Sequence, residues 1–417
     1  MYKIKKIFLL LLVLVVVFSP ASLANEIEFE DEHLENAIRK DIGISDELIN
    51  YDDIQNVSEL NLENASIKSL NGIENFDNLE KLNVSGNEIS NLSPLYNLDN
   101  IQKLNLNYND VTDLSPIYYF NNLKRLEFAQ NDIKNISIID NFSQLEVLNL
   151  QGNDISNLSP ISELNELKRL DAAFVDINDV SILTELTKLE YLFLYDNNID
   201  DVSNLANLKN LETLVFGRDD ISDISALGNL VNLKNLALNE TEVYDISVLS
   251  KLGDLEYLEI HNNDIKDISA LADLKNLNIL YMNNNQIEDI SPLENLINLT
   301  ELSMKGNQIS DINSLSGLYN LTWLRFDHNN VTNIFPLKEL EKLEYLNFSH
   351  NEVSFILPLL DNEGLNENTE IDMRGNNIEG DTESKKVVEE LKNRGVELHY
   401  TFKDDSGNVE DDFSDDF

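Results

Sequence analysis

The sequence of 417 residues contains no cysteine, which excludes disulfide bonds, thiolate metal sites and a cysteine nucleophile. Basic residues are also scarce, because 30 Lys and Arg stand against 76 Asp and Glu, so the formal net charge is −46. A surface this acidic repels nucleic acid and anionic lipid and keeps molecules apart in solution. We therefore expect no nucleic-acid partner and a monomeric protein.

Long hydrophobic runs are missing everywhere except at the N-terminus. There, a basic stretch at residues 3–6 precedes an apolar run at residues 7–18, which is shorter than the ~20 residues that span a bilayer. Residues 22–24 read Ser-Leu-Ala and fit the small-x-small rule for cleavage. We expect residues 1–24 to be a signal peptide rather than an uncleaved anchor, which predicts a secreted, extracellular bacterial protein. No transmembrane segment is expected after its removal, and loose association with the cell surface stays open.

Catalytic motifs are absent as well. The sequence has no G-x-S-x-G, H-E-x-x-H, phosphate-loop or dinucleotide-binding pattern. A glycosidase would need two placed acids, and nothing selects a pair from the many carboxylates. We therefore expect no catalytic residue, no cofactor and no metal site, and hence no enzyme.

The dominant feature of the sequence is an internal repeat of 22 residues. The pattern LxxLxLxxNxIxxLxxLxxLxx starts 14 times between positions 57 and 343 without an insertion. In the copy that begins at Leu79, the alternation of Leu82 and Val84 predicts a short strand with one buried face. Stacked units bury their apolar edges on each other. We predict an α/β leucine-rich-repeat solenoid: a curved, right-handed stack of about 14–15 repeats with a parallel sheet on the concave face.

The asparagine of each repeat stands where the chain must turn inside the stack. A buried amide there can bond the backbone of its own turn and of the next one. At three positions the column holds Val175, Asp219 or Thr241 instead, and we expect a local change in curvature around them. The predicted ladder comprises Asn87, Asn109, Asn131, Asn153, Asn197, Asn263, Asn285, Asn307, Asn329 and Asn351.

The outer half of each repeat predicts short 3₁₀ or irregular segments on the convex face. Ser-Pro pairs, as at Ser93-Pro94, suit the cap and first position of a helical turn. The Leu-x-x-Leu that follows is too short for a long helix. An acidic column, which includes Asp201 and Asp311, precedes these segments. We interpret it as capping, with calcium bridging between repeats as the alternative.

The repeat resembles that of the internalin-type leucine-rich-repeat proteins of Gram-positive bacteria. The resemblance rests on Leu-x-x-Leu-x-Leu-x-x-Asn-x-Ile and on the x-Ile-Ser-Pro-Leu half, and it covers residues 57 to about 364. It extends to residues 29–39, which resemble the helical N-terminal cap of such proteins. It implies recognition of a partner by the curved sheet. An immunoglobulin-like module and a wall anchor, which many members carry, are not recognised in this sequence.

These sequence patterns predict that the chain has five parts. The signal peptide precedes a helical N-terminal cap at residues 25–56 and leucine-rich repeats at residues 57–364. A degenerate last repeat and a helix–strand C-terminal cap follow at residues 365–402. The acidic tail at residues 403–417 is too charged to fold alone, and we predict it to be disordered.

The side chains beside and between the buried strand positions are expected to face the cavity. The first repeats present Lys81, Lys103 and similar residues, which are ordinary solvated side chains. Later repeats present aromatic residues and arginine, the composition of binding hot spots, although β-propensity alone also favours aromatic residues in strands. The predicted partner-binding residues are Phe174, Tyr191, Phe193, Tyr195, Val215, Tyr257, His261, Tyr281, Trp323, Arg325 and Tyr345. His328 and His350 offer only two ligands, so we expect no metal between them.

The function that these patterns favour is non-catalytic recognition of a protein or polysaccharide ligand on the concave sheet. The alternative is a structural component of the cell envelope or extracellular matrix without a discrete ligand. An enzyme in the concave groove is a third and more remote reading, which an acid with a strongly raised pKa would favour.

Overall fold

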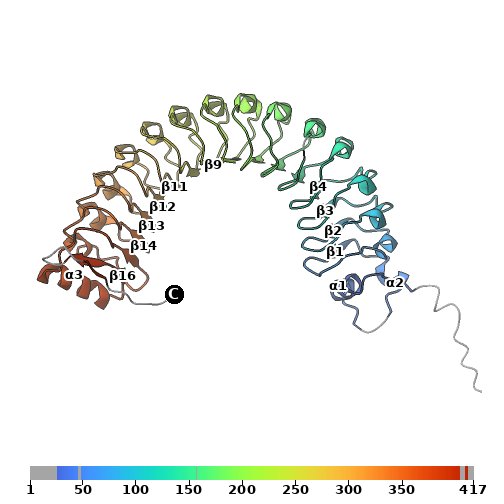
Figure 1. The fold of residues 1–417 in the computed structure, drawn as a ribbon, viewed down its shortest axis with the longest axis horizontal. Coiled ribbons are helices and arrows are strands. Elements are labelled where there is room, and N and C mark those ends of the chain that lie inside the picture. The colour runs from blue at the N-terminus through green and yellow to red at the C-terminus, as the bar shows by residue number, and fades with distance from the viewer. Residues whose placement is uncertain (1–25, 46–47, 156, 404–408, 412–417) are drawn as a thin grey trace, which may run out of the picture.

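Short strands, one from each repeat, form a single parallel sheet along the inner wall of a horseshoe (Figure 1). The computed structural model describes residues 26–45, 48–155, 157–403 and 409–411. From β1 to β14, neighbouring strands pair residues 22 positions apart, as Leu82 does with Leu104. The predicted solenoid with a concave parallel sheet is therefore confirmed. In chain order the strands are β1 Glu59–Asn61, β2 Lys81–Asn83, β3 Lys103–Asn105, β4 Arg125–Glu127, β5 Val147–Asn149, β6 Arg169–Asp171, β7 Tyr191–Phe193, β8 Thr213–Gly217, β9 Asn235–Asn239, β10 Tyr257–Glu259, β11 Ile279–Tyr281, β12 Glu301–Ser303, β13 Trp323–Arg325, β14 Tyr345–Asn347, β15 Glu370–Asp372 and β16 Glu397–His399.

The outer rim consists of 3₁₀ segments of three or five residues, as the short Leu-x-x-Leu halves predict (Figure 1). The side chains that point inward from the strands and from this rim are buried in one continuous core. These segments are η1 Ile73–Asn75, η2 Ser93–Leu95, η3 Ser115–Ile117, η4 Ser137–Asn141, η5 Ser159–Glu163, η6 Ser181–Leu183, η7 Ser203–Asn207, η8 Ser225–Asn229, η9 Ser247–Lys251, η10 Ser269–Leu271, η11 Ser291–Leu293, η12 Asn313–Gly317, η13 Phe335–Glu339 and η14 Leu357–Leu359.

Helices cover the first repeat. Helix α1 (Glu32–Ile42) buries Leu34 and Ile38 against it, and the short α2 (Tyr51–Ile54) follows. Asp31 caps α1 by accepting a hydrogen bond from the backbone of His33. The other oxygen of Asp31 accepts from the backbone N–H groups of Lys68 and Ser69, at 2.6 and 3.1 Å. One carboxylate therefore both starts the helix and ties it to the repeats.

The other end of the stack is closed by α3 (Thr382–Asn393) and β16. The guanidinium of Arg394, just after α3, donates to the carbonyl oxygens of Asn362 and Leu360 at 2.9 and 3.0 Å. Asn362 itself is buried and donates to the carbonyl oxygens of Leu337 and Leu340. These bonds hold the longer last repeat, in which Asn376 follows Asn351 by 25 residues, onto the regular stack.

The acidic tail differs from the disordered segment that its charge predicts. Strand β17 (Thr401–Lys403) pairs antiparallel with β18 (Val409–Asp411). The pairing gives the backbone groups of this segment hydrogen-bond partners. The prediction of disorder rested on side-chain charge and took no account of such backbone pairing. The rest of the predicted tail lies outside the described residues, as does the predicted signal peptide.

Buried asparagines join each repeat to the one before it. The side-chain oxygen of Asn307 accepts from the backbone of Ile287 at 3.1 Å. Its nitrogen donates to the carbonyl oxygens of Met282 and Met304 at 3.0 and 3.1 Å. The ten asparagines of the column are all at most 8% exposed, so each satisfies backbone groups that have no access to water.

The sheet changes where this ladder is interrupted. Strands β8 and β9 have five residues instead of three and pair along their whole length. The turns that follow them carry Asp219 and Thr241 in place of asparagine. At Val175 the difference is in the turn, because Phe174 and Asp176 both adopt positive φ, at 57° and 60°.

A second amide ladder, which we did not predict, runs along the turns between the 3₁₀ segments and the strands. In each case a side-chain nitrogen donates to the carbonyl oxygen 23 residues earlier, as Asn298 does to Lys275 at 2.8 Å. The members are Asn78, Asn100, Asn122, Gln144, Asn210, Asn232, Asn276, Asn298 and Asn320. Because these residues are exposed, each contributes less than a buried ladder amide.

The acidic column caps the 3₁₀ segments. The carboxylate of Asp201 accepts from the backbone N–H of Ser203 at 2.8 Å, and Asp267 makes the same bond to Ser269. Hydrogen bonding to the backbone lowers the pKa of both aspartates. In the described part of the chain, no group of three or more His, Cys, Asp or Glu side chains is arranged to hold a metal ion.

We predict that Asn307→Ala lowers the free energy of unfolding by about 2–3 kcal/mol, because buried backbone groups of two repeats lose their partners. Urea unfolding followed by circular dichroism measures the loss. The matched control is Asn298→Ala on the exposed ladder, which should cost less than about 1 kcal/mol. Equal losses for both variants would contradict the role given to burial.

A second prediction concerns Asp219, whose side chain is only 3% exposed. Burial raises the pKa of Asp219 to about 6, although the backbone N–H groups of Ile199 and Gly217 donate to its carboxylate. A raised pKa means that the folded state prefers the protonated form, so this stability is lost as pH rises through about 6. Asp219→Asn should therefore stabilise the protein by about 1–3 kcal/mol at about pH 8, and by less at about pH 5.

Urea unfolding at the two pH values measures this difference. Asn285→Asp, in an intact part of the ladder, is the reciprocal control and should introduce the same pH dependence. A gain from Asp219→Asn that is equal at both pH values would contradict the interpretation.

Candidate functional site

The concave face of the sheet is built from two columns of side chains. In a three-residue strand the middle residue is buried, and the first and third residues face the cavity and are half-buried by their neighbours, as in β7 and β13. The 22-residue register then places equivalent residues side by side on adjacent strands. Ten of the eleven predicted binding residues are half-buried, eight of them in strands and Tyr195 and His261 in the turns that follow, and Phe174 is exposed.

Four aromatic residues in the C-terminal half touch one another in sequence. The ring centroids of Tyr257 and Tyr281 lie 6.1 Å apart, and those of Tyr281 and Trp323 lie 6.0 Å apart, both edge to face. Trp323 stacks on Tyr345 at 5.3 Å with an interplanar angle of 12°. We call these four residues the aromatic track, which spans β10 to β14.

Carboxylates accompany the aromatic track. The phenol of Tyr257 donates to Glu259, and the phenol of Tyr281 donates to Glu301. Burial is the largest cause that raises the pKa of both tyrosines, and the two carboxylates raise it further. The phenols therefore stay protonated donors, and the site combines ring faces with half-buried negative charge. This combination suits a cationic group.

A second group of aromatic residues lies on β7 and in the turns after β6 and β7, and β7 is three strands before β10. The guanidinium of Arg169 sits 4.5 Å from the ring centroid of Phe193 and 5.8 Å from that of Tyr191. Tyr195 contacts Phe174 at 5.6 Å between centroids and covers Gly217. A Cβ added to Gly217 would lie 2.4 Å from the Tyr195 ring, so the ring needs a glycine there.

The two aromatic groups are not brought together. Strands β8 and β9 separate them and present Val215, Thr213 and Ala237. The predicted column that links Tyr191 with Tyr257 is therefore interrupted by small and polar residues. His261 is half-buried, and its backbone N–H donates to the Asn239 side chain at 3.2 Å.

Arg325 is held by an acid that the sequence analysis did not single out. Its Nε donates to Asp327 at 2.5 Å, and the Nδ1 of His328 lies 2.8 Å from the other oxygen of Asp327. Burial would raise the pKa of Asp327, but the hydrogen bonds from Arg325 and His328 outweigh it and hold the pKa below its usual value. The rings of His328 and His350 lie 4.4 Å apart between centroids.

Several residues beside the inner wall adopt a left-handed backbone that side chains rarely favour. Phe174 and His328 have φ of 57°, His350 has 52° and Tyr108 has 56°. Each occupies the position just before the ladder column, which holds Val175 instead of asparagine after Phe174, and Gly86 stands at this position in the second repeat. The sequence contains this signal, because glycine recurs in the same column, but it was not recognised.

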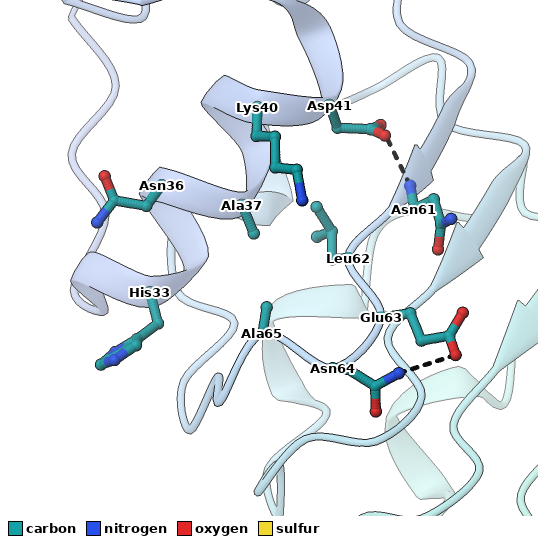
Figure 2. Close-up of a pocket in the computed structure, with 10 residues that line it drawn as sticks. All are labelled: His33, Asn36, Ala37, Lys40, Asp41, Asn61, Leu62, Glu63, Asn64 and Ala65. Carbon is teal, nitrogen blue, oxygen red and sulfur yellow. Dashed lines mark hydrogen bonds between the residues drawn. The ribbon is translucent and has the colours of Figure 1, made fainter.

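Two hollows at the N-terminal end were also missed. An open polar pocket of about 690 Å³ lies between α1 and the first repeat (Figure 2). Asp41 reaches across it and accepts a hydrogen bond from the backbone of Asn61 at 3.2 Å. A second hollow of about 260 Å³ lies on the concave sheet over β1 to β4, where Lys81, Lys103 and Arg125 line it.

Three exposed tyrosines gather on the outer rim, away from the concave sheet. Tyr119 contacts Tyr96 and Tyr118 edge to face, with centroids 5.9 and 5.0 Å apart. Tyr96 and Tyr118 end the segments η2 and η3. None of the helices in the described part of the chain has the length and apolar character that a membrane crossing requires.

Comparison with known proteins gives the same architecture. The family model described as leucine-rich repeats (two copies) matches residues 187–229, 253–295 and 275–317. No curated protein sequence matches the chain. The crystal structure of an internalin (inlF) from Listeria monocytogenes is 35% identical, over 76% of this chain and 94% of that chain, with a TM-score of 0.72.

Two further structures share the fold alone. A leucine-rich-repeat protein of Leptospira interrogans is 24% identical over 84% of this chain and 97% of that chain, with a TM-score of 0.71. The functional domain of InlJ from Listeria monocytogenes is 20% identical over 82% of this chain and 79% of that chain, with a TM-score of 0.68. That domain includes a cysteine ladder, whereas this chain has no cysteine.

Trp323 is the only tryptophan of the chain, so its fluorescence reports on the aromatic track directly. We predict that Tyr345→Ala shifts the emission to longer wavelength and increases quenching by acrylamide, because the stacked ring that shields one face of the indole is removed. Tyr319→Ala, a change at an exposed residue outside the sheet, is the control and should leave both quantities unchanged. An unchanged spectrum for Tyr345→Ala would mean that the stack does not form.

Proposed function

The chain belongs to the internalin-type family of bacterial leucine-rich-repeat proteins, and from this premise we propose that it is a secreted recognition protein. Its concave sheet binds a protein partner, and the protein catalyses no reaction. The single observation that carries the proposal is the aromatic track, in which four rings from β10 to β14 are in contact and half-exposed on the inner wall.

The composition of this surface supports recognition. Tyrosine, tryptophan and arginine are the residues most enriched at binding hot spots. Trp323 and Tyr345 hold each other in place, and Asp327 holds Arg325, before any partner arrives. Side chains that are already ordered lose less conformational entropy on binding, which favours affinity.

The charges beside the aromatic track indicate which partner group fits it. Glu259 and Glu301 place negative charge at the edges of the Tyr257 and Tyr281 rings. A lysine or arginine side chain gains both from the ring faces and from these carboxylates. A neutral sugar would stack on the faces and could donate hydroxyl hydrogen bonds to these carboxylates, but it carries no positive charge for them to attract. A protein partner with exposed basic residues therefore fits better than a neutral polysaccharide.

Secretion and the division of the chain are part of the proposal. The basic and apolar start and the Ser-Leu-Ala site support removal of residues 1–24. The mature chain then consists of the cap at residues 25–56, the repeats at residues 57–364, the closing unit at residues 365–402 and the acidic tail at residues 403–417. The very acidic composition supports a secreted protein that stays soluble and does not bind anionic membranes.

We predict that the mature chain captures a protein from the medium or envelope extract of the producing bacterium or its surroundings, and that the triple variant Tyr257→Ala, Trp323→Ala, Tyr345→Ala retains about a tenth of the capture or less. The physical reason is that hot-spot aromatic residues each contribute about 1–2 kcal/mol or more. Immobilised protein with quantitative mass spectrometry of the bound fraction measures it.

The matched control is Tyr96→Ala, Tyr118→Ala, Tyr119→Ala, which removes as many aromatic rings from the outer rim and should capture normally. Equal capture by both triple variants would overturn the assignment of the site. Absence of any captured protein, together with self-association and sedimentation with the envelope, would favour a structural role instead.

A further inference from the structure

Three cations stand in one column at the N-terminal end of the concave sheet. Lys81, Lys103 and Arg125 are the first residues of β2, β3 and β4, and the register pairs each with the next. Adjacent strands lie about 4.8 Å apart, and like charges directly opposite one another destabilise a sheet. Folding alone therefore gives no reason for this arrangement.

The positive charge of the column is neutralised only at its two ends. The ammonium of Lys81 lies 2.7 Å from the carboxylate of Glu59, and the guanidinium of Arg125 lies 3.1 Å from that of Glu127. Lys103, between them, is exposed and has no ion pair among the described residues. The centre of the column is thus an uncompensated positive site in a protein whose formal net charge is −46.

The column forms one side of the hollow of about 260 Å³ over β1 to β4. A parallel column of amides, Asn61, Asn83 and Asn105, forms the other side. The amide nitrogen of Asn83 donates to Asn61 at 2.9 Å, whereas that of Asn105 has no acceptor within the described part of the chain. Glu59 and Glu127 also line the hollow, but each already pairs with a cation at one end of the column. The ammonium of Lys103 and the amide nitrogen of Asn105 have no partner within the described residues, and such donors suit a carboxylate.

The kind of carboxylate ligand follows from the surroundings. The hollow is lined by leucine, asparagine and charged residues, with no aromatic ring on which a sugar could stack. A long polyanion would also meet the repulsion of the acidic surface beyond the column. A short segment with a few aspartate or glutamate side chains gains the local contacts and avoids most of that repulsion.

We propose that Lys81, Lys103 and Arg125 form a carboxylate-binding column that receives an acidic segment of the partner protein. The proposal rests on the proposed function, because it assumes that the concave face is the recognition surface. It gives that surface two ends of opposite preference. The N-terminal end takes acidic side chains, and the aromatic track, six strands further on, takes basic ones. The partner is then held in one direction along the arc.

The test uses fluorescently labelled peptides and the mature chain. One peptide carries four glutamates in a Gly-Ser background, a second replaces them with glutamine, and a third probe is a short oligomer of galacturonic acid. Fluorescence anisotropy at about 150 mM NaCl limits electrostatic forces to about 8 Å, so that the contact is measured rather than the overall repulsion. The expected result is binding of the glutamate peptide only.

Two variants with the same change of charge separate the column from general electrostatics. The column variant, Lys81→Gln, Lys103→Gln, Arg125→Gln, should raise the dissociation constant of the glutamate peptide about tenfold or more. Lys134→Gln, Lys188→Gln, Lys342→Gln, which changes three exposed lysines elsewhere, should change it less than about twofold. The column variant should melt close to the wild type, because it removes the like-charge repulsion together with two partly exposed ion pairs, which contribute little to stability.

The proposal is overturned if the glutamate peptide does not bind, if both triple variants weaken binding of that peptide equally, or if the uronic-acid oligomer binds in its place. A marked loss of melting temperature in the column variant would indicate a structural role and would also count against it. Failure of the proposed function is separable, since the variant without the aromatic track should still bind the glutamate peptide with unchanged affinity.

Discussion

The bond on which this structure depends is the one that a buried asparagine side chain makes to the backbone of the repeat before it. Its partners lie 20 and 25 residues earlier, as Ile287 and Met282 do for Asn307. An amide can satisfy a donor and an acceptor at once, which neither a carboxylate nor an aliphatic side chain can do. The ladder therefore fixes the offset of successive repeats, and the fixed offset sets the strand register. Where Asp219 and Thr241 replace the amide, the paired strands are longer.

The inner wall inherits its chemistry from that register. Side chains 22 residues apart become neighbours, so a substitution in one repeat is always presented beside its counterparts in the next ones. Trp323 stacks on Tyr345 for this reason, and Lys103 stands between Lys81 and Arg125 for the same reason. The proposed binding surfaces are thus columns, and their length is set by how many consecutive repeats carry the same kind of residue.

The period of the sequence was sufficient to predict the solenoid, the concave sheet and the 3₁₀ rim, because each follows from burial at fixed spacing. The N-terminal cap was expected from the resemblance of residues 29–39, and the C-terminal cap lies where the period is lost. The period placed Tyr257 and Trp323 on the inner wall but not the contacts between them. Those contacts cross from the third position of β11, at Tyr281, to the first positions of β10 and of β13, two strands further on, and depend on side-chain rotamers. The sequence alone presents Lys81 and Lys103 as ordinary solvated residues, because their alignment with Arg125 becomes significant only when the three strands are paired. The outer amide ladder was overlooked although asparagine recurs before Leu79, Leu211 and Leu277. Strand β18 was not predicted, because the charge of a segment does not show whether its backbone pairs with another strand.

The left-handed position before each ladder asparagine has a consequence for how such a protein can diversify. Glycine fills it at Gly86, Gly152 and Gly306, yet tyrosine, phenylalanine and histidine fill it elsewhere with the same backbone angle. The stack evidently tolerates the cost of a side chain there, about 1 kcal/mol, because the ladder bonds over-determine the turn. A residue at this edge is exchanged without disturbing the core or the register. Evolution can therefore vary the margin of the proposed recognition surface one repeat at a time, while the frame that presents it stays unaltered.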